Sequence, residues 1–84
     1  MKYAWDIEAD HLLDEVSKVW CNVFRNLDTD EVHTFDLTQT QEALQFIDNH
    51  VTLLVGHNII DYDLRVLKKL YNYTYTGELL DTLV

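Results

Sequence analysis

The amino-acid sequence predicts one α/β domain, residues 1–84, with the element order β-β-β-α-β-α-β. Three observations support this prediction. Alternating or continuous apolar residues mark five short strands, apolar residues at helical spacing mark two helices, and a chain of 84 residues suits one domain. A three-stranded meander followed by two crossovers gives a mixed sheet with helices on its faces.

Three strands are expected in the first half of the chain. Residues 2–8 alternate apolar and polar side chains, so this strand has one apolar face. Residues 16–25 are apolar on both faces, which is typical of a strand covered on both sides, at least in part. A hairpin turn rich in Asn and Asp then leads into a third strand at residues 31–35.

The first helix and the fourth strand follow. Thr38 and Gln41 match a capping box, in which the hydroxyl and the Gln side chain satisfy orphan backbone amides. This helix should end near Asn49. Residues 51–55 are continuously apolar and are followed by Gly56, which suits a buried parallel strand.

The second helix and the last strand complete the predicted order. A helix is predicted from about Ile60 to Tyr71. Four apolar residues at helical spacing share one of its faces: Ile60, Leu64, Leu67 and Tyr71. The final residues, 78–84, are predicted to form a strand.

Charge limits the possible functions. The chain carries 15 Asp and Glu residues against 6 Lys and Arg residues, a formal net charge of −9. Proteins that grip a phosphate backbone by themselves are usually basic, because counterion release drives that binding. The charge therefore fits a bound cation, a partner-delivered substrate or a basic protein partner. Arg65, Lys68 and Lys69 form the one basic cluster, which is either a solvated helix face or a weak phosphate contact.

No membrane segment and no internal disulfide are expected. The longest apolar run, VTLLV, is far too short to cross a bilayer, and the first residues lack the apolar region of a signal peptide. Cys21 is the only cysteine, which fits a reducing compartment. We therefore expect a cytoplasmic protein.

Several residues that could suggest a site have ordinary explanations. His11, His33 and His50 lack a spacing typical of metal ligands and are expected at the surface or half-buried. Trp5 and Trp20 are expected in the core rather than as platforms for stacked bases.

Asp6 and Glu8 form the first candidate constellation. Side chains alternate along a strand, so these two carboxylates point the same way, about 6.5–7 Å apart. Such carboxylates are costly in a protected place unless they are paired or coordinated, and Mg²⁺ prefers oxygen ligands of this kind. The competing interpretation is that acidic residues simply lie at the exposed end of a strand.

The second constellation follows the fourth strand. His57 and Asn58 come directly after Gly56, and Asp63 falls in the first turn of the next helix. Crevices at the carboxyl ends of strands are the usual site position in open α/β sheets. If this strand lies parallel to the first, Asp63 can approach Asp6 and Glu8. In the competing interpretation, residue 58 or Asp61 caps the helix and Asp63 complements its dipole.

Four short segments together resemble a known family. DIEA at residues 6–9, HN at 57–58, DYDLRVL at 61–67 and DTLV at 81–84 occur in the order seen in the proofreading 3′–5′ exonuclease domain of family A DNA polymerases, in the form found in short-tailed phages. The broader family is the DnaQ-like (DEDD) exonucleases. The resemblance covers the whole chain and implies a three-layer ribonuclease-H-like fold, a role in DNA replication and a place in the host cytoplasm.

The resemblance also implies roles for individual residues. Asp6, Glu8 and Asp63 match the acidic residues of the first two exonuclease motifs and would be catalytic ligands of Mg²⁺ or Mn²⁺. His57 and Asn58 match the segment beside the substrate strand and would bind substrate.

The end of the sequence matches the family in one residue and departs from it in another respect. Asp81 matches the acidic residue of the last strand and would support the site or the structure. Family members continue into a third motif, a Tyr or His followed by an Asp, and into the polymerase domain, but this sequence ends at Val84 before either.

We therefore expect a proofreading module that is incomplete alone and binds the 3′ end of DNA weakly. The alternative is an acidic nuclease-like binding module without catalysis, such as a decoy, an inhibitor or a subunit of a split polymerase.

The missing helical region predicts an uncovered sheet face. Apolar side chains of the central strands and of Leu79, Leu80, Leu83 or Val84 should be bare, and exposed apolar patches usually mark an interface. We expect homo-oligomerisation or a protein partner, and the negative charge favours a basic partner.

Overall fold

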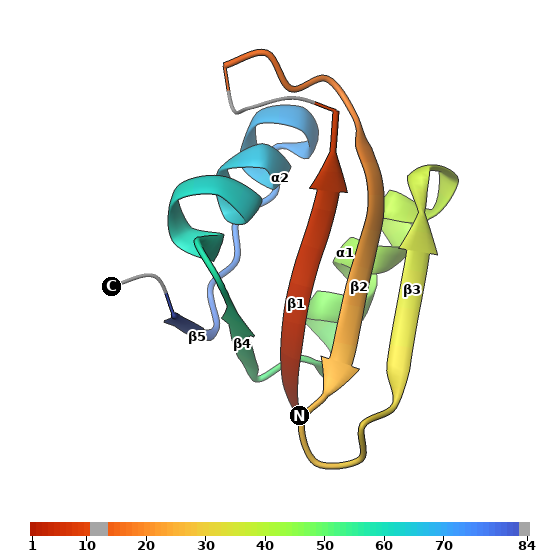
Figure 1. Cartoon of the computed structure of the whole chain (residues 1–84), viewed down its shortest axis with the longest axis vertical. Coiled ribbons are helices and arrows are strands. Elements are labelled where there is room, and N and C mark those ends of the chain that lie inside the picture. The colour runs from red at the N-terminus through yellow and green to blue at the C-terminus, as the bar shows by residue number, and fades with distance from the viewer. Residues whose placement is uncertain (11–13, 83–84) are drawn as a thin grey trace.

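Strand β1 (Lys2–Ala9) lies at the centre of a five-stranded mixed sheet with the order β3-β2-β1-β4-β5 (Figure 1). The computed structural model describes residues 1–10 and 14–82. β1 pairs antiparallel with β2 and parallel with β4, β3 pairs antiparallel with β2, and β5 pairs parallel with β4. The remaining elements are β2 (Val19–Asn26), β3 (Val32–Asp36), the 3-10 turn η1 (Leu37–Gln39), α1 (Thr40–His50), β4 (Leu53–Gly56), the π-helical turn η2 (Ile59–Asp63), α2 (Leu64–Tyr71) and β5 (Glu78–Asp81).

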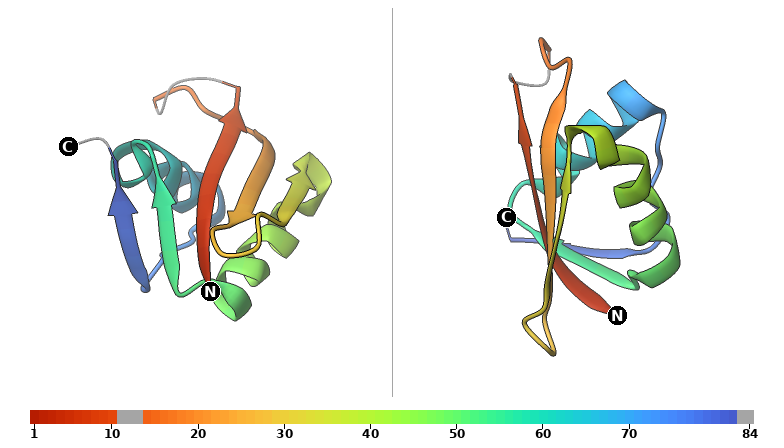
Figure 2. Two further views of the ribbon diagram at one scale, coloured as in Figure 1. Left: turned by 60° about the horizontal axis from the view of Figure 1, so that its bottom comes forward. Right: turned by 90° about the vertical axis from the view of Figure 1, so that its right-hand side faces the viewer.

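The predicted fold class and element order are confirmed, and the topology is consistent with a ribonuclease-H-like fold. The described residues form two layers rather than three, because both helices lie on the same face of the sheet (Figure 2). β3, β4 and β5 run in one direction, and the chain moves across the sheet the same way in both crossovers. Since such crossovers are right-handed, α1 and α2 are placed on one side.

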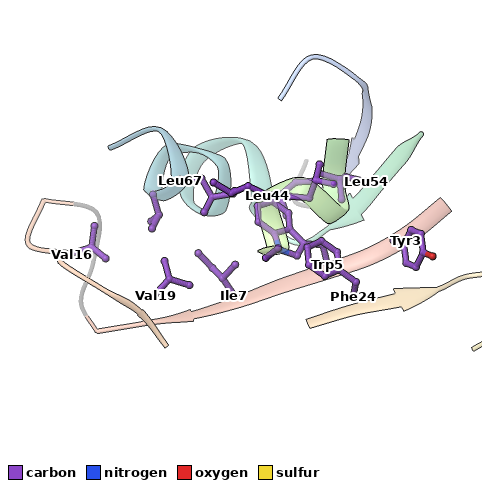
Figure 3. Packing of buried hydrophobic residues seen from close by; sticks show 13 residues of the cluster. Tyr3, Trp5, Ile7, Val16, Val19, Phe24, Leu44, Leu54 and Leu67 are labelled. Atoms are coloured by element: carbon purple, nitrogen blue, oxygen red, sulfur yellow. The ribbon is translucent and has the colours of Figure 1, made fainter. Parts of the chain in front are cut away.

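The core lies between the helices and the inner face of the sheet (Figure 3). Tyr3, Trp5 and Ile7 alternate on the inner face of β1 and are buried, as the sequence pattern predicts. Trp5 stacks on Phe24 of β2 with ring centroids 6.2 Å apart. Each large apolar side chain buried in this way contributes roughly 1.5–3 kcal/mol.

Trp20 does not lie in the core, which corrects the prediction. The register between β1 and β2 shifts so that Glu8 pairs with Cys21 but Ala9 pairs with Val19. Trp20 is the extra residue of this β-bulge, and its side chain is 48% exposed. The bulge changes which face each residue occupies, so β2 is covered on one face only.

Helix boundaries differ from the prediction by small shifts with clear causes. The capping box forms two residues before the predicted one. The amide of Asp36 donates to Oε1 of Gln39 at 3.1 Å, and the Asp36 carboxylate accepts from the amide of Thr38 at 2.9 Å. A 3-10 turn therefore precedes α1.

At the second helix, the π turn η2 inserts an extra residue into the first turn. Ile59 and Asp63 therefore face the sheet, whereas Ile60 is 49% exposed. The predicted inward position of Ile60 is wrong for this reason.

Several expectations about exposure agree with the structure. Leu79 and Leu80 of β5 are exposed, as expected, while residues 83–84 and His11 lie outside the described residues. His33 contacts Glu31 at 2.8 Å and is half-buried. No helix in the described part of the chain is long and apolar enough to span a membrane.

Gly56 ends β4 and lies beside the backbone of β1. A Cβ atom at this position would lie 2.8 Å from the carbonyl oxygen of Trp5 and would also meet the side chain of Ile59. We expect Gly56→Ala to lower the free energy of unfolding by roughly 1–3 kcal/mol, because a backbone atom cannot move aside cheaply. Urea unfolding measures this change. Gly77→Ala is the control, since its Cβ would meet only the movable side chain of Tyr75, and an equal loss in both variants would contradict the explanation.

Candidate functional site

The candidate site lies where β1 continues beyond its neighbour β4. The two strands pair only from Lys2 to Ala4 of β1, and β4 ends at Gly56. The remaining part of β1 therefore has no strand on this side. The turn η2 enters this space and brings Asp63 towards β1, as the sequence predicts for a parallel neighbour.

Asp63 is the most unusual residue of the site. Its side chain is 4% exposed, and its Oδ2 atom has no hydrogen-bond partner among the described residues. The pKa of Asp63 is raised from its ordinary value to about 7, first by burial and then by the charge of Asp6. Hydrogen bonds from the backbone amides of Ile7 and of Asp63 itself lower this pKa and so offset part of the increase. A carboxyl group is thus held partly protonated near neutral pH.

Asp6 and Glu8 lie on the opposite, outer face of β1 and are exposed. Alternation along the strand places both on one side, as expected. The charges of Asp6 and Asp81 both raise the pKa of Asp63, so these three carboxylates surround one region. Within residues 1–10 and 14–82, however, no three His, Cys, Asp or Glu side chains are grouped closely enough to hold a metal. The expected convergence of all three ligands is therefore not seen.

Asp81 holds the start of η2 in place. Its Oδ1 accepts a hydrogen bond from the amide of Asn58 at 2.8 Å, and its Oδ2 accepts one from the amide of Ile60 at 2.9 Å. Neither Asn58 nor Asp61 provides the side-chain cap that the alternative interpretation predicts. A carboxylate from β5 takes this role and so fixes the turn that carries Asp63.

His57 and Asn58 lie beside the carboxylates, at the end of β4. The exposed ring of His57 has its Nδ1 atom 3.3 Å from Oγ1 of Thr82. Asn58 adopts a left-handed backbone conformation with φ of 60°, which Asn tolerates better than most residues. His57 and Asp6 both line a hollow of about 520 Å³ on the outer face of the sheet, whereas Asn58 does not.

Tyr62 and Asp10 were missed by the sequence analysis. Burial raises the pKa of Tyr62, with further increases from the charges of Asp63, Asp10 and Glu8, so the phenol lies within the acidic region. Asp10 accepts hydrogen bonds from the amides of Ser17 at 2.9 Å and Lys18 at 3.1 Å and closes the loop after β1. Tyr62 stands directly before Asp63 in the sequence, which was the only available signal.

The remaining candidate groups behave as surface features. Lys68 donates to Asn72 and Lys69 donates to the carbonyl oxygen of Asp14, each at 3.0 Å. The ring of His50 packs against Phe46 with centroids 5.2 Å apart.

Comparison with known proteins gives no relative: no protein-family model and no curated protein matches the chain.

Asp6 and Asp63 are the two carboxylates of this site that could hold a divalent cation. Magnesium is commonly bound through one or two carboxylates, with water and substrate phosphate completing its shell. Asp63 and Asp6 are two such carboxylates, and the buried Oδ2 atom of Asp63 lacks a partner among the residues described. A cation between them would remove their repulsion. Two carboxylates of this kind are compatible with a cation whose shell is completed by water or substrate, and residues 1–10 and 14–82 contain no group of three protein ligands.

Asp63 should make the stability of the fold depend on pH. Its pKa is about 7 in the folded chain against an ordinary value of 3.8, so between these values the folded state binds more protons than the unfolded state. The free energy of unfolding should therefore fall as pH rises through this window. Between about pH 5 and pH 8 the natural chain should lose roughly 2–3 kcal/mol of its free energy of unfolding through this titration. Asp63→Asn cannot titrate at this position and should not show this loss.

Urea unfolding at several pH values measures this difference. Asp61→Asn is the matched control, because Asp61 is an exposed carboxylate in the same turn. The explanation fails if Asp63→Asn and Asp61→Asn have the same pH profile.

Proposed function

We propose that this chain is a metal-dependent 3′–5′ exonuclease module that removes nucleotides from DNA ends. The observation that carries the proposal is the buried carboxylate of Asp63, whose Oδ2 atom has no partner within the described chain and which feels the charge of Asp6. Perturbed carboxyl groups of this kind occur preferentially at functional sites. The four ordered sequence segments and the mixed-sheet topology support the same assignment.

The proposed reaction is hydrolysis of the terminal phosphodiester. A water oxygen attacks the phosphorus atom and loses a proton to solvent. The bond to the 3′ oxygen of the preceding nucleotide breaks, this oxygen takes up a proton to form a 3′ hydroxyl, and a 5′-mononucleotide leaves. When bound, Mg²⁺ would stabilise the negative charge that develops on the phosphate and acidify the attacking water. Asp6 and Asp63 would hold this ion, and the exposed Glu8 would orient water on the outer face.

Other residues would position the substrate and the site. His57 lines the outer hollow together with Asp6, so its ring can contact a nucleotide placed there. The backbone of Asn58 is held by Asp81, which keeps η2 and therefore Asp63 in place. The phenol of Tyr62 lies among the carboxylates and can donate a hydrogen bond to one of them or to a phosphate oxygen.

The charge of the chain restricts how substrate reaches the site. A net charge of −9 repels a DNA strand, so binding by this chain alone should be weak. A cation at Asp6 and Asp63 reduces the repulsion only locally. Delivery of the 3′ end by an attached or associated DNA-binding protein, such as the polymerase part, is consistent with this charge.

A second candidate function is protein binding without catalysis. It is favoured by the apolar outer face of the sheet, where Leu80 and Val32 are each 55% exposed. A decoy, an inhibitor and a subunit of a split polymerase all belong to this class.

The first test is direct metal binding. We expect Mn²⁺ to bind weakly, and binding should be lost in Asp63→Asn and in Asp6→Asn, because each change removes one of two anionic ligands. Electron paramagnetic resonance of free Mn²⁺ reports the bound fraction without requiring activity. Asp61→Asn should bind as the natural chain does, and equal binding by all variants would place the cation elsewhere.

The second test is digestion of a 5′-labelled single-stranded oligonucleotide with Mn²⁺. We expect slow stepwise shortening by the chain alone, because its net charge of −9 disfavours binding of the oligonucleotide. Any stepwise shortening should disappear in Glu8→Gln and in Asp63→Asn. Shortening that persists in both variants would argue against this site.

A further inference from the structure

The face of the sheet opposite the helices carries an apolar strip that no described segment covers. We call it the outer strip and define it by Val32, Val23, Ala4, Val55 and Leu80. Strand pairing joins Leu80, Val55 and Ala4 in one row. The row continues through the exposed side chain of Arg25 to Val32, while Val23 lies in the next row, opposite Asp6. The strip therefore reaches from β5 to β3 but is interrupted on β2 by the charged side chain of Arg25.

The outer strip is hollowed rather than flat. The hollow of about 520 Å³ is lined by four of its residues, Ala4, Val23, Val32 and Val55, and also by the charged side chains of Asp6 and Arg25. A side chain as large as Leu or Phe can enter such a depression. The hollow thus combines apolar side chains with one carboxylate and one guanidinium directly beside them.

Acidic residues border the strip on one side. Asp6 and Glu8 follow Ala4 on the outer face of β1, and Asp36 of β3 lies in the same row as Glu8, because both residues pair with Cys21. All three carboxylates are exposed. A partner with basic residues beside its apolar surface would meet opposite charges here.

We propose that the outer strip binds an amphipathic helix of a partner protein, with Lys or Arg residues along one edge of the helix's apolar face. The strip lies on the sheet face, where only side chains are presented, so a helix fits it better than a strand that pairs through its backbone. A second copy of the chain is disfavoured, because each copy carries a net charge of −9. This inference goes beyond nuclease activity and holds whether or not the chain binds a metal.

The proposal can be tested with a designed peptide. The probe is a fluorescently labelled helix of about 18 residues with Leu at i, i+3, i+4 and i+7 and Lys on the flanking positions. Two control peptides carry Glu in place of Lys or the same residues in an order without an apolar face. Anisotropy measures binding, and amide shifts in nuclear magnetic resonance spectra locate it.

Two variants of the protein test the strip itself. We expect the Leu and Lys peptide to bind and to shift amides of β1 to β5, with affinity reduced about tenfold or more by Val32→Asp and by Leu80→Asp. Leu27→Asp is the control, because Leu27 is 45% exposed but lies in the turn after β2. Circular dichroism confirms that each variant is folded.

Three results would overturn the proposal. One is equal binding of the Glu peptide or of the peptide without an apolar face. Another is an equal loss of affinity in Leu27→Asp and Val32→Asp. The third is a dimer in sedimentation experiments that Val32→Asp dissociates, which would make a second copy the occupant of the strip.

Discussion

The alternation of side chains along β1 is the constraint on which the other features of this protein depend. Odd-numbered residues of the strand, from Tyr3 to Ile7, face inward and form the centre of the core, while Asp6 and Glu8 face outward. A shift of one residue would exchange the two sets and bury both carboxylates. Pairing with β2 on one side and β4 on the other prevents that shift, so packing and the acidic site are set by one register.

The same register places the charge of Asp6 close to the buried carboxyl group of Asp63, which is electrostatically unfavourable. Asp63 is buried next to the charge of Asp6, and the backbone amides of Ile7 and Asp63 only partly offset the loss of water around its carboxyl group. Asp81 holds the turn that imposes this position, through hydrogen bonds to two amides. The fold therefore keeps the carboxyl group of Asp63 in a buried position that disfavours its charged form, and the hydrogen bonds of Asp81 help to fix that position. Such an arrangement is typical of sites where a cation or a proton is part of the function.

The handedness of the two crossovers explains why one face of the sheet is uncovered. Both helices must lie on the inner face, because both connections advance in the same direction between parallel strands. The outer face keeps its apolar row together with the carboxylates of β1. The metal-site proposal and the partner proposal thus concern one surface and share the hollow that Asp6 and His57 line. A helix seated in this hollow and a nucleotide placed against His57 would therefore exclude one another.

The sequence by itself determined the strands, the helices, their order and the outward pair Asp6 and Glu8, because local periodicity encodes each of these features. Tertiary structure decided the remainder. The bulge at Trp20 inserts one residue into β2 and so moves side chains to the opposite face of the sheet from the one that periodicity predicts. The π turn inserts one residue before α2 and so rotates the side chains around the helix axis. The sequence predicts that Asp63 approaches Asp6, but the burial of Asp63 and the capping role of Asp81 depend on segments far apart in the chain. Desolvation and charge repulsion act through space, so no local pattern could reveal them.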